Sequence, residues 1–150
     1  MHDIRFDDAR LLGFGFSRQK ARYVRDLARA VATGGLDLAG LAGLPDEDVH
    51  RALVTQTGIG PWTASIYLLM VLGRPDIWPA TDMALATAVA DVKGLARRPD
   101  ATQMQALAVV WAPWRSVAAR LFWHDYLCRR GRGESAVSPG DPPEPATPAG

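Results

Sequence analysis

Three features of the sequence could act together in a chemical reaction: a carboxylate, several tryptophans and a glycine-rich turn. Asp82 lies in WPATDMAL, after a proline-containing loop and before an apolar stretch. Trp62 follows the turn in TQTGIGPWTA (55–64), where Gly58 and Gly60 are two residues apart. A fixed carboxylate stabilises the positive charge that builds on a sugar as its N-glycosidic bond breaks, and aromatic walls stack on a base. An enzyme that cleaves the N-glycosidic bond of a nucleotide would use residues of these types.

Each feature also has an ordinary structural explanation. Asp82 is placed to cap the N-terminus of a helix, where a carboxylate accepts hydrogen bonds from free backbone amides. Most tryptophans are core residues. The chain has five, and Trp111 in particular suits a core: Trp62, Trp78, Trp111, Trp114 and Trp123. Two glycines between helices can simply end the first helix. The residue types alone therefore leave both interpretations open.

The glycine turn is the feature that most directly suggests a partner. Gly58 and Gly60 have no Cβ, so they tolerate positive φ and let another backbone approach closely. Their amides, followed by a helix that begins at Pro61, form a seat for an anion such as a phosphate. We expect the flanking helices to pack through Leu53 against Ile66 and Leu69. This predicts a helix–hairpin–helix element, which binds nucleic-acid backbone without reading sequence.

The fold class follows from helical periodicity along most of the chain. Ser17 is a helix cap, and Ala21, Val24, Ala28 and Val31 share one face of the helix after it. No segment alternates as a strand, so we predict an all-α domain over 1–130. Residues 131–150, rich in Pro, Gly and Ser, predict a disordered tail. The expected helices span 17–32, 46–55, 61–72, 82–93, 99–110 and 113–130.

Composition limits the classes of site and partner. The single cysteine, Cys128, excludes an internal disulfide and an all-cysteine metal or iron–sulfur site within one chain, and it fits a reducing cytoplasm. The histidines His2, His50 and His124 lack metal-ligand spacing. No window has the ~18 apolar residues of a membrane span, so we expect no membrane partner. Without its acidic tail the chain carries 16 bases and 13 acids, a formal charge of +3, which permits an anionic partner.

Three blocks, in order, resemble the helix–hairpin–helix DNA glycosylases, and most closely the branch of DNA-3-methyladenine glycosylase II. They are TGIGPWTA, WPATDMAL and WAPWRSVAARLFW, within a resemblance that covers about residues 10–128. It implies a helical domain with an aromatic cleft for a flipped base. It also implies base-excision repair by hydrolysis of the N-glycosidic bond of alkylated purines such as 3-methyladenine. The implied partner is double-stranded DNA with alkylated bases, in the cytoplasm at the nucleoid.

The resemblance assigns roles to individual residues. Asp82 matches the catalytic aspartate, and Trp62 and Trp123 match the tryptophans that stack on the base. Trp114 matches a tryptophan that we interpret as structural, and Arg115 would either reach a phosphate or cap a helix. The residues that match the DNA-binding hairpin are Thr57, Gly58, Ile59, Gly60 and Pro61, with threonine where members often have proline.

The resemblance also bears on cofactors and on strand cleavage. In the family, hairpin carbonyls hold a monovalent cation that bridges to a phosphate, and Gln56 and Ile59 match those positions. No other cofactor is implied. Bifunctional members carry a lysine two residues after the second hairpin glycine, where this chain has Trp62. Without that amine no Schiff base forms, so we expect a monofunctional enzyme that leaves an abasic site.

The chain departs from the family at its N-terminal end. Full-length members have further helices before the stretch that resembles 10–33, and those helices carry the wedge that fills the gap left by a flipped base. We expect Leu11, Leu12, Phe14 and Phe16 to lack their usual cover. A truncated gene, a fragment, and a subunit completed by another chain or copy all fit. The alternatives are a non-catalytic DNA-binding module, an inactive truncated glycosylase, and a helical domain that dimerises through the uncovered face.

Overall fold

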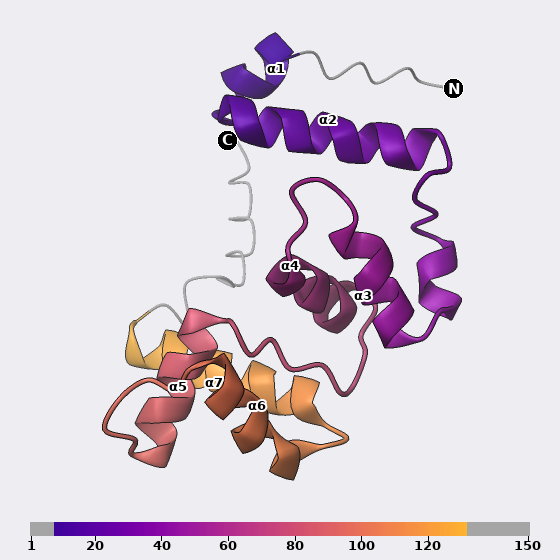
Figure 1. Cartoon of the computed structure of the whole chain (residues 1–150). Coiled ribbons are helices and arrows are strands. Elements are labelled where there is room, and N and C mark those ends of the chain that lie inside the picture. The colour runs from indigo at the N-terminus through magenta and orange to yellow at the C-terminus, as the bar shows by residue number, and fades with distance from the viewer. Residues whose placement is uncertain (1–7, 132–150) are drawn as a thin grey trace, which may run out of the picture.

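A computed structural model describes residues 8–131, and this part of the chain is helical, without a strand (Figure 1). The all-α prediction is confirmed. Most of the helices begin within two residues of the expected positions, and a short helix before Ser17 was not expected. In chain order the elements are α1 (Asp8–Gly13), α2 (Arg18–Ala32), the 3-10 helix η1 (Gly40–Gly43), α3 (Asp46–Val54), α4 (Pro61–Ile66), the π-helix η2 (Tyr67–Val71), α5 (Met83–Lys93), α6 (Ala101–Ala108), the 3-10 helix η3 (Val109–Trp111) and α7 (Arg115–Arg129).

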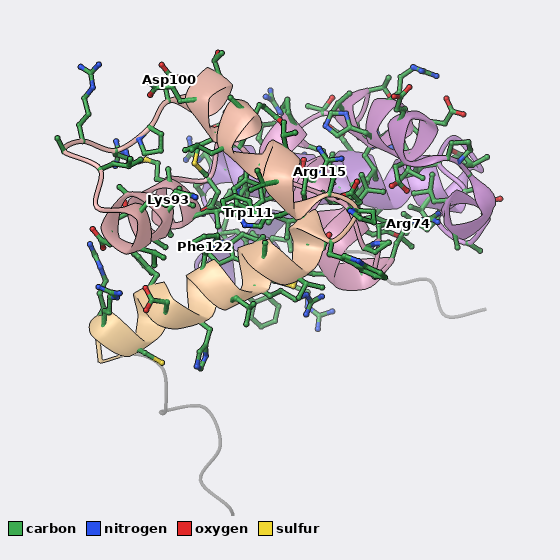
Figure 2. The ribbon with its side chains drawn as sticks, turned by 90° about the horizontal axis from the view of Figure 1, so that it is seen from below. Arg74, Lys93, Asp100, Trp111, Arg115 and Phe122 are labelled. Carbon is green, nitrogen blue, oxygen red and sulfur yellow. The ribbon has the colours of Figure 1, made fainter. Side chains whose placement is uncertain are left out.

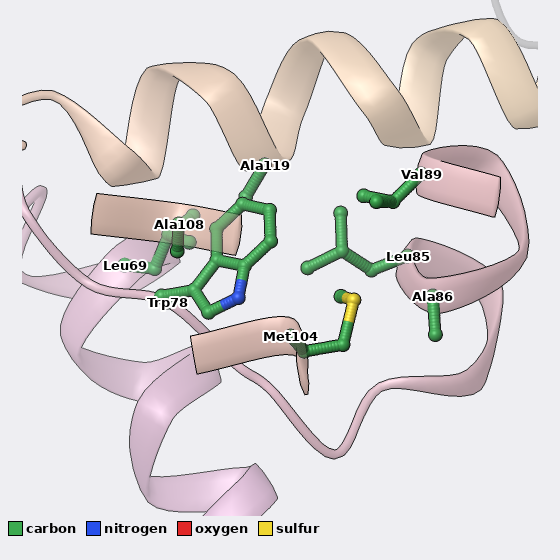
Figure 3. Close-up of a cluster of buried hydrophobic side chains, with 8 residues drawn as sticks. All are labelled: Leu69, Trp78, Leu85, Ala86, Val89, Met104, Ala108 and Ala119. Atoms are coloured by element: carbon green, nitrogen blue, oxygen red, sulfur yellow. The ribbon is translucent and has the colours of Figure 1, made fainter. Parts of the chain in front are cut away.

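Two clusters of buried side chains form the core. Figure 3 shows the first, in which Trp78 and Leu85 lie between α5, α6 and α7. The second lies between α3, α4 and the segment before α3, with side chains of α2 packed against it. The first contains Leu69, Trp78, Leu85, Ala86, Val89, Met104, Ala108 and Ala119, and the second contains Leu36, Leu41, Val49, Leu53, Ala64 and Leu68. Because Leu68 and Leu69 are consecutive in η2, this one turn joins the two clusters.

Local signals in the sequence set several helix ends. The Ser17 hydroxyl accepts a hydrogen bond from the Lys20 amide, 3.2 Å away, and so caps α2. Asp100 and Gln103 form a reciprocal capping box that begins α6. Gly94 ends α5 in the left-handed region, with φ 63°. These caps agree with the sequence, because each depends on residues within one helical turn.

Two packing predictions were wrong in register. Leu53 packs with Ala64 and Leu68, while Leu69 faces the other cluster. The α-helix after the hairpin ends at Ile66 and widens into the π-helix, which turns the later side chains away from an α-helical stripe. On α2, Ala21 is buried and Val24 is half-buried, but Ala28 and Val31 of the same expected face are exposed. The side chains of α2 that pack on the second cluster are Leu27 and Ala30.

Three of the four N-terminal apolar residues are uncovered as expected, whereas the expectation for Leu11 was wrong. Leu11 is buried, but Leu12, Phe14 and Phe16 keep 40%, 70% and 37% of their surface exposed. The expected disordered tail lies outside the described residues except for Gly131. Among the described residues, none of the helices has the length and apolar character needed to cross a bilayer.

Candidate active site

Asp82 begins α5 as its N-cap residue. Its Oδ1 accepts a hydrogen bond from the Leu85 amide over 2.7 Å, and its own amide donates to the Pro79 carbonyl over 2.9 Å. The residue is only 9% exposed. The capping interpretation is therefore correct for one oxygen. A carboxylate has about four acceptor positions, so the cap leaves most of its capacity for other donors.

Two tryptophans supply those donors. Trp62 donates its indole N–H to Oδ2 of Asp82 over 2.8 Å, and Trp123 donates its own to Oδ1 over 3.2 Å. Trp62 lies in the first turn of α4 and Trp123 lies in α7, 20 and 41 residues away from the aspartate. The fold thus brings together the three residues that the sequence analysis singled out for chemistry. Hydrogen bonds to a charged acceptor are the stronger kind, so the carboxylate is held in one orientation.

This arrangement suits electrostatic stabilisation of a cation at the protein surface. Asp82 is nearly removed from water, while Trp62 beside it is 45% exposed. A fixed anion in such surroundings interacts more strongly with nearby charge than one in bulk water. Three cavities of about 450, 320 and 270 Å³ are lined by other residues, and none of the three is lined by Asp82, Trp62 or Trp123. The carboxylate and its two indole donors therefore lie outside these three cavities.

The hairpin has the backbone that its glycines predict. Gly58 takes φ +88°, in the left-handed region, whereas Gly60 is extended at φ −91°, ψ 172°. The Ile59 amide donates to the Gln56 carbonyl over 3.1 Å. Within residues 8–131, the amides of Gly58 and Gly60 donate no hydrogen bond to the backbone, and both residues are exposed. Thr57 is exposed beside them, so this turn presents free donors to a partner.

The hairpin also contacts a residue that the sequence analysis missed. A Cβ on Gly58 would overlap the ring of Tyr23, which therefore packs directly on the glycine from α2. The Tyr23 hydroxyl accepts a hydrogen bond from Gln19 over 2.6 Å. A glycine is thus required at position 58 for two reasons: its positive φ, and the absence of a Cβ that would meet the Tyr23 ring. The only sequence signal for this contact is an aromatic residue on α2, two helices before α4, which is too common to be specific.

Arg115 anchors the start of α7, and the sequence left its role open. Its guanidinium forms a two-point ion pair with Asp76, at 2.6 and 2.7 Å, and its amide donates to the same carboxylate over 3.2 Å. Figure 2 shows Arg115 at the beginning of α7. These hydrogen bonds lower the pKa of Asp76, and the carboxylate raises the pKa of Arg115. Arg115 therefore fixes the helix that carries Trp123.

Ser116 strengthens the same anchor, whereas Trp114 takes no part in the core. The Ile77 amide donates to the Ser116 hydroxyl over 2.9 Å, and the Ser116 amide donates to the Pro75 carbonyl over 3.0 Å. Trp114 is 62% exposed, which does not fit the structural role expected for it. Trp111 is partly buried, as expected, and its ring centroid lies 5.1 Å from those of Trp78 and Phe122.

The described residues offer no conventional transition-metal site. Within 8–131, no three His, Cys, Asp or Glu side chains are grouped so that they could hold a metal ion. The hairpin carbonyls are a different kind of ligand, because they are neutral oxygens that suit a monovalent cation. The Gln56 carbonyl accepts the Ile59 amide and keeps a second lone pair. A cation held by Gln56 and Ile59 stays a prediction.

The chain is similar to known DNA-repair proteins along most of its length. Residues 2–113 match the family described as HhH-GPD superfamily base excision DNA repair protein. The Bacillus subtilis protein YfjP, named as a putative DNA-3-methyladenine glycosylase, is 37% identical over 108 residues, which are 72% of this chain and 38% of that protein. A Bacillus subtilis DNA-3-methyladenine glycosylase is 30% identical over 105 residues, 70% of this chain and 35% of the relative. The chain thus spans little more than a third of these relatives.

Solved structures show the same fold. A Bacillus halodurans DNA-3-methyladenine glycosidase superposes with a TM-score of 0.72 at 28% identity, covering 85% of this chain and 58% of that one. Schizosaccharomyces pombe 3-methyladenine DNA glycosylase Mag1, solved in complex with abasic DNA, gives a TM-score of 0.69 at 26% identity. That match covers 79% of this chain and 58% of Mag1. With a family match over residues 2–113, the chain belongs to the HhH-GPD superfamily of base excision DNA repair proteins.

Proposed function

We propose that this chain is a monofunctional DNA N-glycosylase that releases alkylated purines, such as 3-methyladenine, from double-stranded DNA. The observation that carries the proposal is the contact of Asp82 with both indoles, at 2.8 and 3.2 Å. Relatives named for 3-methyladenine excision and a neighbour solved with abasic DNA support the substrate class. The hairpin supports binding to the DNA backbone, because the exposed amides of Gly58 and Gly60 can donate hydrogen bonds to a phosphate.

In the proposed reaction the flipped nucleotide lies in front of Asp82. An alkylated purine is cationic, so it stacks well on the electron-rich faces of Trp62 and Trp123 and leaves without a strong general acid. As the bond from sugar to base breaks and its electron pair leaves with the base, the carboxylate stabilises the positive sugar, orients water for attack at the same carbon and takes up the proton that the water loses. The products are a free base and an abasic site. A hairpin cation at Gln56 and Ile59 would add to phosphate binding.

Release of base from methylated duplex DNA tests the proposal. The wild-type chain should release 3-methyladenine and leave the strand intact, and Asp82→Asn should not. Asparagine still caps a helix, so this variant should fold. Asp91→Asn is the matched control, since Asp91 is an exposed carboxylate on the same helix, and it should retain wild-type activity. Equal activity of Asp82→Asn and wild type would overturn the assignment, as would the lack of any release by the wild type.

A further inference from the structure

The hairpin has a cationic neighbour on α2. This helix carries five basic residues and one acid, Asp26, although the whole chain has a formal charge of only +1. With 3.6 residues per turn, spacings of 4, 3 and 4 place four of the basic residues on one stripe. They are Arg18, Arg22, Arg25 and Arg29. In Figure 1 the turn that joins α3 to α4 lies directly under α2.

Arg22 is the member of this stripe that is tied to the hairpin. Its guanidinium carbon lies 5.6 Å from the centroid of the Tyr23 ring, within the range of a cation–π contact. The same ring packs against Gly58, and its hydroxyl is held by Gln19. The same phenol ring therefore lies next to both the guanidinium and the glycine turn. Arg22 is exposed, so its charge faces solvent rather than a buried partner.

We propose that Arg22, supported on Tyr23, binds a DNA backbone phosphate next to the one that the hairpin amides bind. This inference rests on the proposed function, and it adds a second phosphate site that extends the contact from the hairpin onto α2. A guanidinium presents a planar pair of N–H donors that matches phosphate oxygens, and the cation–π contact with Tyr23 favours a position next to the hairpin. Charge complementarity and continuity with the hairpin select DNA backbone as the occupant.

Arg29, in the same stripe, provides a control for Arg22. Arg29 lies about two turns further along α2, is exposed, and faces Asp26 at 3.8 Å. Removing its charge changes the net charge of the chain as much as removing that of Arg22, but at a site away from the hairpin. An effect of Arg22→Gln that is absent in Arg29→Gln therefore reports a local phosphate contact rather than long-range electrostatics.

The salt dependence of duplex binding tests this site. Fluorescence anisotropy with a labelled, undamaged duplex gives the dissociation constant at several salt concentrations. Each phosphate contact contributes about 0.9 to the slope of log affinity against log salt. Arg22→Gln should reduce that slope by about 0.9 and weaken binding several-fold at low salt, equally for undamaged and methylated duplexes. Arg29→Gln should match wild type.

A second variant tests the role of the ring. Tyr23→Leu removes the ring that lies next to the guanidinium. Adding Arg22→Gln to Tyr23→Leu should therefore weaken duplex binding less than Arg22→Gln alone weakens it in the wild type. An unchanged salt slope in Arg22→Gln would overturn the site and leave the proposed glycosylase standing. A lowered slope in a chain that releases no alkylated base would contradict the proposed glycosylase and leave the phosphate site standing.

Discussion

The indole N–H of Trp62 lies 2.8 Å from Oδ2 of Asp82, across 20 residues of chain. The hydrogen bond connects the helix that follows the hairpin to the N-cap residue of α5. The Trp62–Asp82 hydrogen bond would thus fix the distance between a DNA phosphate bound at the hairpin and a sugar in front of Asp82. The tryptophan acts on this carboxylate as a donor, in addition to any stacking by its ring.

Replacing Trp62 by phenylalanine should separate these two roles. Phenylalanine keeps an aromatic face but cannot donate to Asp82. A hydrogen bond to a charged group contributes about 1.5–3 kcal/mol, so the excision step should slow by about tenfold or more. KM for methylated duplex should change little, because the ring remains. Single-turnover and steady-state kinetics measure the two quantities. Wild-type rates in Trp62→Phe would show that the indole N–H has no part in catalysis.

The two hairpin glycines should respond differently to alanine. Gly58→Ala places a Cβ against the ring of Tyr23 in a backbone conformation that alanine disfavours, so we expect a loss of about 1–3 kcal/mol in unfolding free energy. Gly60 is extended, and no atom lies within 4 Å of the place that an alanine methyl group would take, so Gly60→Ala is the control. Denaturant unfolding compares them. Equal losses in both variants would contradict the close packing of Tyr23 on Gly58.

The Asp76–Arg115 pair predicts a pH-dependent contribution to stability. Because the folded-state pKa of Asp76 is lowered from its ordinary value of 3.8, its contribution is present above that pH and is lost as the pH falls through the lowered value. At neutral pH, Asp76→Asn should reduce the unfolding free energy by about 1–2 kcal/mol. The difference from wild type should shrink below about pH 4. A difference that stays constant down to about pH 2 would exclude the ion pair as its cause.

Much of the candidate site could be predicted because its signals are local or belong to a recognisable block. The cap at Asp82, the glycine turn and the helix starts each depend on a few neighbouring residues. The nearness of Trp62 and Trp123 to Asp82 was expected only through the resemblance to a family. Spacing in the sequence does not show that side chains 41 residues apart will meet.

The contacts that were missed depend on tertiary packing. Asp76 resembles a solvated loop residue in sequence, because its partner lies 39 positions away at the start of α7. Tyr23 gives no sign that its ring will rest on Gly58. The register change at Tyr67–Val71 was also missed, because an apolar run gives the same pattern for an α-helix and a π-helix. In each case the deciding information is which helix packs against which.

In the proposed reaction Asp82 speeds cleavage of the N-glycosidic bond and does not contribute to duplex affinity. The most direct test is the single-turnover rate of 3-methyladenine release by Asp82→Asn, measured on duplex whose binding is titrated in the same preparation. We predict a rate at least about a hundredfold below wild type, the size of effect seen when one such electrostatic group is removed, with duplex affinity within a few-fold of wild type. A rate within a few-fold of wild type would show that Asp82 is not the catalytic carboxylate.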